Sequence, residues 1–367
     1  MSSDYIPFEI QSEIMKRLPV KSLVQFRSVS KQWKSFIDNP EFIKSYHINH
    51  PNPQHHLLVR YTLDTVRTYT SIIDDNTFPQ QKFPLISPEP VNSLIYRTIL
   101  GSVDGLLCFY GSYKDIELET KMVVLWNPSV RKCVGIIIPN VLYSPEGYTR
   151  IAFGVCRDTN DPKLVKINVI KTPIIRWEVQ VFTLSSHVWK TVYTGVPFKS
   201  CTLMFEHVFV DGIIYWSTRD SFILSFDLKS EKLGEVCIPE RLVHTYDLCL
   251  AKVNESLGLL EYYREGGMSL CGVWMRKDGV NKPFTKIYTV TVEGMSVFNS
   301  VLGFRNNGEV VLQLDDDDDF EGSQVEVYEP SSRRINSVGI SGERLSFSAW
   351  SYMETLVLLD QSNFIIH

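Results

Sequence analysis

Side chains able to do chemistry are common in this chain, but they form no recognisable catalytic or metal-binding pattern. The 367 residues include seven cysteines and eight histidines, and no two cysteines have the C-x-x-C spacing of a zinc site. His55 and His56 are adjacent, so on a strand they face opposite sides, while His47 and His50 lie in a polar linker. The motifs G-x-S-x-G, G-x-x-x-x-G-K-[ST] and H-E-x-x-H do not occur. We therefore predict a protein without catalytic activity, metal or cofactor.

The run Asp315 to Asp319, followed by Phe320 and Glu321, is the one block of like charge. It falls between two predicted strands, so a solvated loop is the default interpretation. A calcium loop requires alternating ligands and a glycine-enforced turn, which this run lacks. A contact with a basic loop of another protein is the alternative, because loops on a rigid scaffold often serve recognition.

Composition and charge describe a globular protein with a substantial core. Hydrophobic residues make up 44% and charged residues 22%, with a net charge of −5, so we expect neither a nucleic-acid nor a membrane partner. The N-terminus lacks the pattern of a signal peptide, and no apolar run has the ~20 residues of a membrane helix. The cysteines are scattered singly through apolar segments, which is typical of a reducing compartment. These features predict a cytoplasmic and/or nuclear protein.

Residues 4–46 have the pattern of short helices. Ile6, Ile10, Ile14 and Leu18 recur every four positions along one helix face, and Pro19 ends that helix. A second helix follows, then a third capped by Ser30, and a restart at Asn39-Pro40.

A module of about 40 residues is too small to bury a complete core. Either the following domain or a partner protein must therefore cover its remaining apolar residues. A DNA-binding helix-turn-helix is the competing interpretation, but no helix has Arg, Asn and Gln clustered on one face.

From residue 57 onward the helical period disappears, and short strands separated by turns replace it. One strand–turn–strand pattern returns five times, starting at Val123, Val179, Phe222, Gly272 and Val325. It alternates with a strand organised around glycine, as in SVDGLLCFY (102–110) and FVDGIIYWS (209–217). Four strands per ~50 residues predict a β-propeller of about six or seven blades, and a large irregular β-sandwich is the alternative.

Trp126 precedes the predicted turn at Asn127-Pro128-Ser129. We predict that it packs between blades and does not form a ligand platform. The same prediction applies to the tryptophans at comparable strand positions, Trp177, Trp189, Trp216 and Trp274.

The segment IPFEIQSEIMKRLPVKSLVQFRSVSKQWKSFIDNPEFIKSY resembles the F-box, and closely its plant version. The resemblance implies docking to a Skp-type adaptor, which links the chain to cullin and RING subunits. By motif position the implied adaptor-binding residues are Ile6, Pro7, Ile10, Ile14, Leu18, Pro19 and Leu23. Val29 and Trp33 match the residues that hold the third helix against the others. Ile6 stands where the family commonly has Leu, which preserves an apolar side chain.

The segments GSVDGLLCF, VVLWNPSVRK, AFGVCRDTNDPKLVKI and VEVYEPSSRRI resemble the plant F-box-associated domain, a kelch-like, propeller-like fold. Residues ~47–95 match it poorly, and Ala152-Phe153-Gly154 replaces the family's Gly-Phe-Gly. The expected division is an F-box over 1–46 and a substrate-recognition domain over 47–367. The resemblance implies that the second domain binds an unknown protein destined for ubiquitination.

Together these resemblances predict the substrate-recognition subunit of a Skp–cullin–F-box ubiquitin ligase, with no catalysis of its own. Two alternatives remain open from the residues: an interaction scaffold that acts outside a ligase, and a β-propeller enzyme.

Overall fold

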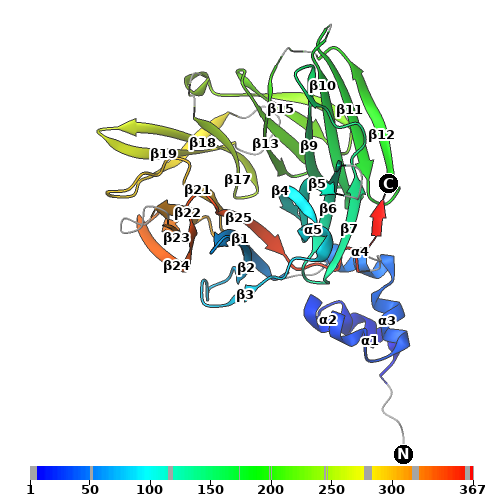
Figure 1. Ribbon diagram of the computed structural model, residues 1–367. Coiled ribbons are helices and arrows are strands. Elements are labelled where there is room, and N and C mark those ends of the chain that lie inside the picture. The colour runs from blue at the N-terminus through cyan, green and yellow to red at the C-terminus, as the bar shows by residue number, and fades with distance from the viewer. Residues whose placement is uncertain are drawn as a thin grey trace, which may run out of the picture. The chain divides into compact units, whose positions relative to one another are not determined.

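The computed structural model describes residues 6–49, 53–114, 119–172, 174–197, 199, 201–243, 245, 247–276, 283–315, 322–359 and 364–366. Helices open this part of the chain and strands dominate the rest (Figure 1). The opening helices are α1 (Phe8–Met15), α2 (Val20–Phe26), α3 (Lys31–Ile37) and α4 (Pro40–Asn49). None of the helices in the described ranges has the length and apolar character to cross a membrane.

Six sheets follow, and most neighbouring strands in them pair antiparallel. The first sheet combines β1 (His55–Leu63), β2 (Val66–Ile73) and β3 (Lys82–Pro84) with β25 (Ser348–Met353), and the second combines β4 (Leu94–Val103), β5 (Leu106–Lys114), β6 (Glu119–Asn127) and β7 (Lys132–Ile137) with β26 (Phe364–Ile366). The third consists of β8 (Tyr143–Ser144), β9 (Gly147–Cys156), β10 (Asp161–Ile170), β11 (Arg176–Thr183) and β12 (Val188–Gly195), and the fourth of β13 (Leu203–Val210), β14 (Ile213–Thr218), β15 (Phe222–Asp227) and β16 (Lys232–Cys237). The fifth consists of β17 (Leu248–Val253), β18 (Ser256–Glu265), β19 (Met268–Arg276) and β20 (Phe284–Val290), and the sixth of β21 (Val301–Phe304), β22 (Val310–Asp315), β23 (Gly322–Glu329) and β24 (Arg334–Glu343). Two short helices, α5 (Glu89–Asn92) and η1 (Glu240–Leu242), lie in connections between sheets.

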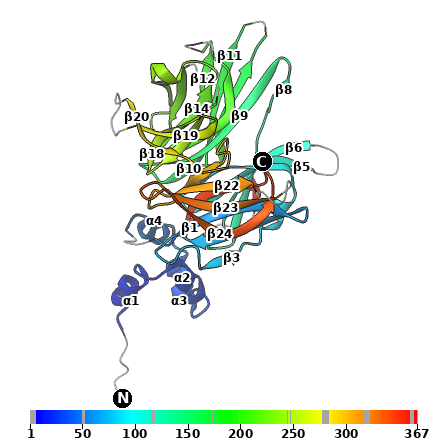
Figure 2. The same ribbon diagram turned by 90° about the vertical axis from the view of Figure 1, so that its left-hand side faces the viewer.

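The predicted fold class is confirmed: the chain is mainly β, with a helical module at its N-terminal end and six propeller blades after it. The five repeats found in the sequence are the third and fourth strands of five blades, β6–β7, β11–β12, β15–β16, β19–β20 and β23–β24. Figure 2 shows one such blade with β22, β23 and β24 side by side.

Tight turns join the first two strands of several blades. Asp104 and Gly105 connect β4 to β5 with φ values of 48° and 75°, and Asp211 and Gly212 connect β13 to β14 with φ values of 48° and 81°. Two successive positive φ angles define the hairpin turn whose twist matches that of the strands, and Asp-Gly is a preferred pair for it. The glycine-centred repeats in the sequence mark these turns.

One blade draws its strands from two distant parts of the chain. The strand β25 pairs beside β1, so three N-terminal strands and one C-terminal strand form a single sheet. The last described strand, β26, runs parallel to β7, with Phe364 opposite Val134 and Ile366 opposite Ile136. The C-terminal segment therefore contributes strands to two blades.

By its internal contacts the chain divides into two compact units. Unit 1 comprises Met1–His56, Ser87–Ile138 and Tyr352–His367, and unit 2 comprises Leu57–Ile86 and Pro139–Ser351. Unit 1 therefore contains the helical module, the blade β4–β7 and the C-terminal segment, while unit 2 contains most of the strands.

In unit 2 the apolar faces of neighbouring sheets bury one another. Trp177 on β11 and Trp216 on β14 are buried in one such core, together with Ile167 from β10. Trp274 on β19 is buried in another core with Tyr215 from β14. The prediction that strand tryptophans pack between blades is confirmed for these three. Trp126 on β6 is also buried, beside Phe109 of the same blade, whereas Trp189 on β12 is only partly buried.

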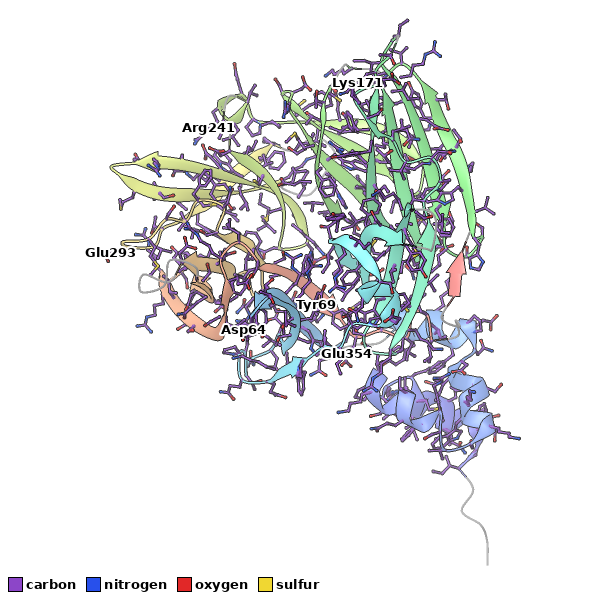
Figure 3. The ribbon with its side chains drawn as sticks, viewed as in Figure 1. Asp64, Tyr69, Lys171, Arg241, Glu293 and Glu354 are labelled. Atoms are coloured by element: carbon purple, nitrogen blue, oxygen red, sulfur yellow. The ribbon has the colours of Figure 1, made fainter. Side chains whose placement is uncertain are left out.

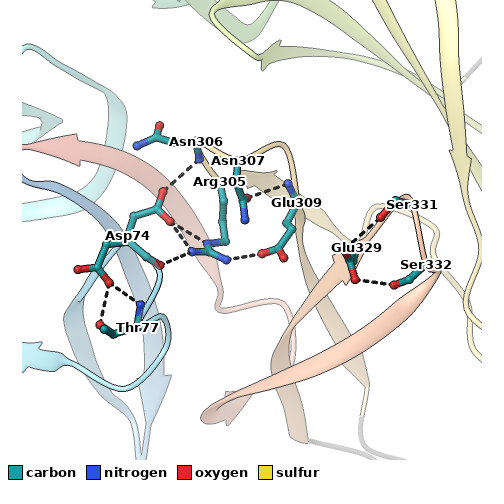
Figure 4. Close-up of polar contacts among 10 residues, drawn as sticks. Asp74, Thr77, Arg305, Asn306, Asn307, Glu309, Glu329, Ser331 and Ser332 are labelled. Atoms are coloured by element: carbon teal, nitrogen blue, oxygen red, sulfur yellow. Dashed lines mark hydrogen bonds and ion pairs between the residues drawn. The ribbon is translucent and has the colours of Figure 1, made fainter.

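A buried ion-pair cluster links the sixth blade to the loop that follows β2, also within unit 2 (Figure 4). Arg305 Nε donates to Asp74 Oδ1 at 2.8 Å, and its guanidinium also pairs with Glu309. The guanidinium carbon lies 3.7 Å from the centre of the Phe78 ring. Because Arg305 and Asp74 are both almost fully buried, each is the other's charge compensation.

Candidate functional site

Three half-exposed isoleucines lie at the start of the helical module, Ile10 and Ile14 on α1 and Ile6 just before it. Ile6 is 50% exposed, Ile10 53% and Ile14 48%, although their spacing is that of a helix face that would normally turn inward. The buried residue of α1 is Met15 instead. A contiguous exposed apolar face of this kind marks an interaction surface.

The two predicted prolines flank helix starts and are also exposed. Pro7 immediately precedes α1 and its carbonyl accepts from Ile10 N and Gln11 N at 3.1 Å. Pro19 plays the same part before α2, where no N–H is needed from the residue. Leu18, just before Pro19, is only partly buried, and its carbonyl accepts a 2.6 Å hydrogen bond from Tyr46 Oη. This bond fixes the corner between α1 and α2 onto α4.

Leu23 differs from the other predicted contact residues, because it has no exposed surface at all. It lies in the core of the helical module together with Met15, Val20 and Ile37. Leu23 therefore holds α2 in the module's core and presents no surface to a partner.

The third helix is held against the first by Trp33. Its indole Nε1 donates to Gln11 Oε1 at 2.8 Å, and its ring lies 5.1 Å from that of Phe26. The predicted cap is present, with Trp33 N donating to Ser30 Oγ at 3.1 Å. Val29 does not share in this packing, because it lies in the turn after α2 and its side chain is 62% exposed. It therefore adds to the exposed apolar surface of the module.

An ion pair between Arg27 and Asp38 also stabilises the helical module. Arg27, at the end of α2, donates from Nε and Nη2 to the two carboxylate oxygens of Asp38, at 2.5 and 2.8 Å. The two-pronged geometry fixes the distance between the end of α2 and the end of α3. Ile6, Ile10, Ile14 and Val29 are thus exposed on a module whose helix ends are held together by this ion pair.

The core of the helical module is completed by residues from outside it. Val130, from the turn between β6 and β7, and Leu356 and Leu359, from the C-terminal segment, are buried in the same cluster as Met15, Leu23 and Tyr46. Within unit 1, other segments of the same chain therefore cover part of the apolar surface of the helical module.

Asn127 anchors that C-terminal segment. Its side chain is fully buried, and Nδ2 donates to Thr355 O and Val357 O at 3.1 and 2.8 Å. Its Oδ1 accepts from Ser129 N at 3.0 Å and from Tyr352 Oη at 3.3 Å. The sequence predicted the turn at this asparagine, but no local signal showed that its side chain binds a segment so distant in the chain.

Gly105 makes room for the same segment. A Cβ at this position would lie 2.7 Å from Met353 O and still closer to the Thr355 side chain, and φ is +75°. Close approach of the backbone and a left-handed conformation both require glycine here.

The cysteines, the aspartate run and the histidines were the other candidate sites in the sequence. The seven cysteines are free thiols and five of them are buried, in agreement with their predicted core role. Residues 316–321 of the aspartate run lie outside the described residues, while Asp315 ends β22 and pairs with Arg344 at 2.7 Å. His56 Nε2 lies 3.5 Å from Glu354 Oε1, whose residue is labelled in Figure 3. Among the described residues no cluster of His, Cys, Asp and Glu suits a metal ion, and the need for no cofactor stays a prediction.

Two family models match this chain. The F-box domain matches residues 4–45, and the F-box associated beta propeller domain matches residues 56–362. The second match covers most of the chain. The chain belongs to the F-box-associated β-propeller family.

Its relatives are plant F-box proteins. F-box protein At2g21930 of Arabidopsis thaliana is 29% identical over 247 residues, which are 63% of this chain and 60% of that protein. The Arabidopsis F-box/WD-40 repeat-containing protein 1 is 26% identical over 320 residues, 82% of this chain and 72% of that protein. The alignment with the first of these spans about three fifths of its length.

Among solved structures, the WD40 domain of SCAP from fission yeast is 14% identical, with a TM-score of 0.34, over 78% of this chain and 77% of that one. The β-propeller domain of the Trilobed protease from Pyrococcus furiosus is 12% identical, with a TM-score of 0.35, over 66% and 72% of the two chains. Scores this low support no argument about function.

Proposed function

We propose that this F-box protein is the substrate-recognition subunit of a Skp–cullin–F-box ubiquitin ligase. The observation that supports it is the half-exposure of Ile6, Ile10 and Ile14, which remain open although the module's core is filled, in part by residues from outside the module. A Skp-type adaptor covers these isoleucines and connects the chain to the cullin and RING subunits. The propeller binds a target protein, and the receptor acts in the cytoplasm and/or nucleus.

The contribution of such a subunit to ubiquitin transfer is proximity. Holding a target and a loaded conjugating enzyme in one assembly raises their effective concentration, and the bond-making chemistry belongs to other subunits. A stiff link between the adaptor-binding and target-binding parts improves this effect. The shared core of the F-box and the blade β4–β7 in unit 1 supplies stiffness at the F-box end.

The surface assignment is tested by co-expression with a Skp-type adaptor. Ile10 and Ile14 are better targets than Leu18, because Leu18 packs against the module's core and its replacement would also disturb folding. We expect the Ile10→Asp/Ile14→Asp variant to lose about tenfold to a hundredfold in adaptor affinity, since covering the exposed halves of two isoleucines contributes roughly 1.5–3 kcal/mol. Ile335→Asp, which places the same change on an exposed strand position of β24, is the matched control.

Size-exclusion chromatography and titration calorimetry measure the complex, and circular dichroism verifies folding. A stoichiometric complex of wild type and Ile335→Asp, lost in the double variant, supports the proposed docking surface. Adding cullin and RING subunits then tests ligase function by self-ubiquitination of the receptor. Folded wild-type protein that binds no adaptor refutes the assignment. Adaptor binding without ubiquitin transfer favours the scaffold alternative.

A further inference from the structure

A partly buried arginine stands between two blades of unit 2, and no carboxylate of the described residues pairs with it. Arg150 belongs to β9, the third blade, and its Nε donates to Leu203 O and Met204 O on β13, the first strand of the fourth blade, at 3.2 and 3.0 Å. Its Nη1 donates to Thr149 O at 3.2 Å. These bonds fix the guanidinium in place through Nε and Nη1, and among the described residues Nη2 makes no hydrogen bond.

Aromatic rings lie beside this guanidinium. Its carbon is 4.3 Å from the centre of the Tyr148 ring and 5.9 Å from that of Phe205. Phe205 is 53% exposed and lies on β13, the strand whose Leu203 and Met204 carbonyls accept from the arginine. Stacked rings and carbonyl bonds hold the arginine rigid, so little further entropy is lost when it binds something.

Two more cations border the rings. Lys171, labelled in Figure 3 beyond the end of β10, has its Nζ 5.4 Å from the centre of the Tyr148 ring. The positive charge of Arg219 also reaches Tyr148, where, with Arg150, it partly offsets the rise in the tyrosine pKa that burial causes. Among the residues that the structure describes, no carboxylate lies within 4 Å of Arg150, Lys171 or Arg219.

Three acidic residues lie near these cations. Glu146 O accepts from Lys171 N at 2.8 Å, Asp220 accepts from Thr202 N at 3.2 Å, and Glu206 contributes, after burial, to the raised pKa of the Cys249 thiol. Among the described residues none of these carboxylates forms an ion pair with Arg150, Lys171 or Arg219, so the three cations remain open to a carboxylate from a partner.

We propose that the platform formed by Tyr148, Arg150, Lys171 and Phe205 binds an acidic segment of the target protein, with an Asp or Glu carboxylate on Arg150 and a neighbouring apolar side chain on Phe205. This proposal rests on the receptor function proposed above. It follows from charge complementarity: Nη2 takes part in none of the hydrogen bonds above, so the guanidinium can still donate to a carboxylate. The exposed ring of Phe205 supplies apolar contact area beside it.

The experiment uses the full chain in complex with a Skp-type adaptor, probed with an array of twelve-residue peptides. Each peptide has a central Asp or Glu next to Phe or Leu, and is matched by versions with Asn or Gln, with phosphoserine, and with Lys at the acidic position. A charge-assisted bidentate pair corresponds to about a tenfold to hundredfold preference for the carboxylate over its amide. We expect this preference in wild type, and its loss in Arg150→Gln.

Arg150 also donates hydrogen bonds to the β13 backbone, so its replacement can lower stability. Thermal unfolding and circular dichroism are therefore measured for each variant. Lys171→Gln is the second variant, because Lys171 is exposed and its replacement leaves the packing intact. It should reduce acidic-peptide binding about threefold to tenfold, in line with the loss of one surface charge contact, and leave binding of amide-matched peptides unchanged.

Equal binding of acidic and amide peptides refutes the proposal, and stronger binding of phosphoserine peptides shows that the platform serves phosphoryl groups instead. Adaptor binding measured on the same samples separates the two proposals. A normal adaptor complex without carboxylate preference rejects the platform alone, while carboxylate preference in a chain that binds no adaptor rejects the ligase function alone.

Discussion

The anchoring of the C-terminal segment by Asn127 gives a sharp test of the fold. Replacing Asn127 by Ala removes an amide that donates to Thr355 O and Val357 O and accepts from Ser129 N. The side chain is fully buried, so water does not readily replace these bonds. The change therefore leaves buried backbone groups without partners.

The magnitude follows from these contacts. Each buried polar group that loses its partner costs about 1–3 kcal/mol, and two carbonyls and one N–H are affected. Because Ser129 N also bonds to Tyr352 Oη at 3.0 Å, only the carbonyls lose their main donor. We therefore expect Asn127→Ala to lower the free energy of unfolding by about 3 kcal/mol.

Asn127→Asp provides a matched comparison. It keeps the shape and the accepting oxygen, but it turns a carboxylate oxygen toward Thr355 O and Val357 O. Such a buried, repelled carboxylate has a raised pKa, so its native state favours protonation. Stability of this variant should be lowest at neutral pH and recover as pH falls toward the range where the group binds a proton.

Urea unfolding followed by tryptophan fluorescence measures both variants, with the midpoint and slope fitted separately. Limited proteolysis reports whether the segment at residues 352–359 is released first. An Asn127→Ala variant within about 0.5 kcal/mol of wild type, the range of ordinary surface substitutions, would refute the reasoning. An Asn127→Asp variant with no pH dependence beyond that of wild type would do the same.

Gly105→Ala should lower the free energy of unfolding by about 1–2 kcal/mol from its left-handed backbone alone, and by more because the new Cβ meets Met353 O. Gly266→Ala, where a Cβ meets nothing, is the control. Comparing the two variants in thermal unfolding isolates the effect of the contact with Met353 O. Arg305→Met should cost about 3–5 kcal/mol, because it leaves Asp74 buried without its cation; a loss below about 1 kcal/mol in urea unfolding would contradict the pairing. Burial raises the pKa of Glu231, but hydrogen bonds from two lysines outweigh it and the net shift is downward. Glu231→Gln should therefore lower the free energy of unfolding by about 1 kcal/mol at neutral pH. This difference from wild type should vanish as pH falls below the ordinary carboxyl pKa of 4.5. A difference in unfolding free energy that does not change with pH would contradict the lowered pKa.

Local patterns were sufficient to predict the repeated parts of the fold. Asp104-Gly105 and Asp211-Gly212 have a conformational preference that acts over two residues, and Trp177 and Trp216 lie on strands whose alternation shows the buried face. The Ser30 cap and the isoleucine spacing of α1 were readable for the same reason. Each of these signals depends on neighbours within about one turn or strand.

The features that the sequence did not show all depend on distant residues. The blade that contains β1 and β25 has no repeat in the sequence, because its strands come from opposite parts of the chain. Leu23 and Ile10 look alike in a helical pattern, yet one is buried and the other is half exposed. Val130, Leu356 and Leu359 decide which apolar faces of the module remain open. Arg150 could not be singled out from the sequence, because the residues around it in space are distant from it in the chain.

The shared core of unit 1 also bears on the order in which this chain is made. The ribosome releases the F-box helices first, but Leu356 and Leu359, which share their core, are translated only after nearly every blade. A nascent or truncated chain therefore presents the isoleucines of α1 on a module whose interior is incomplete, and domains generally fold as units during synthesis. Completion of the propeller thus becomes a condition for a well-packed F-box. Under the function proposed above, recruitment by an adaptor depends in this way on the integrity of the finished chain.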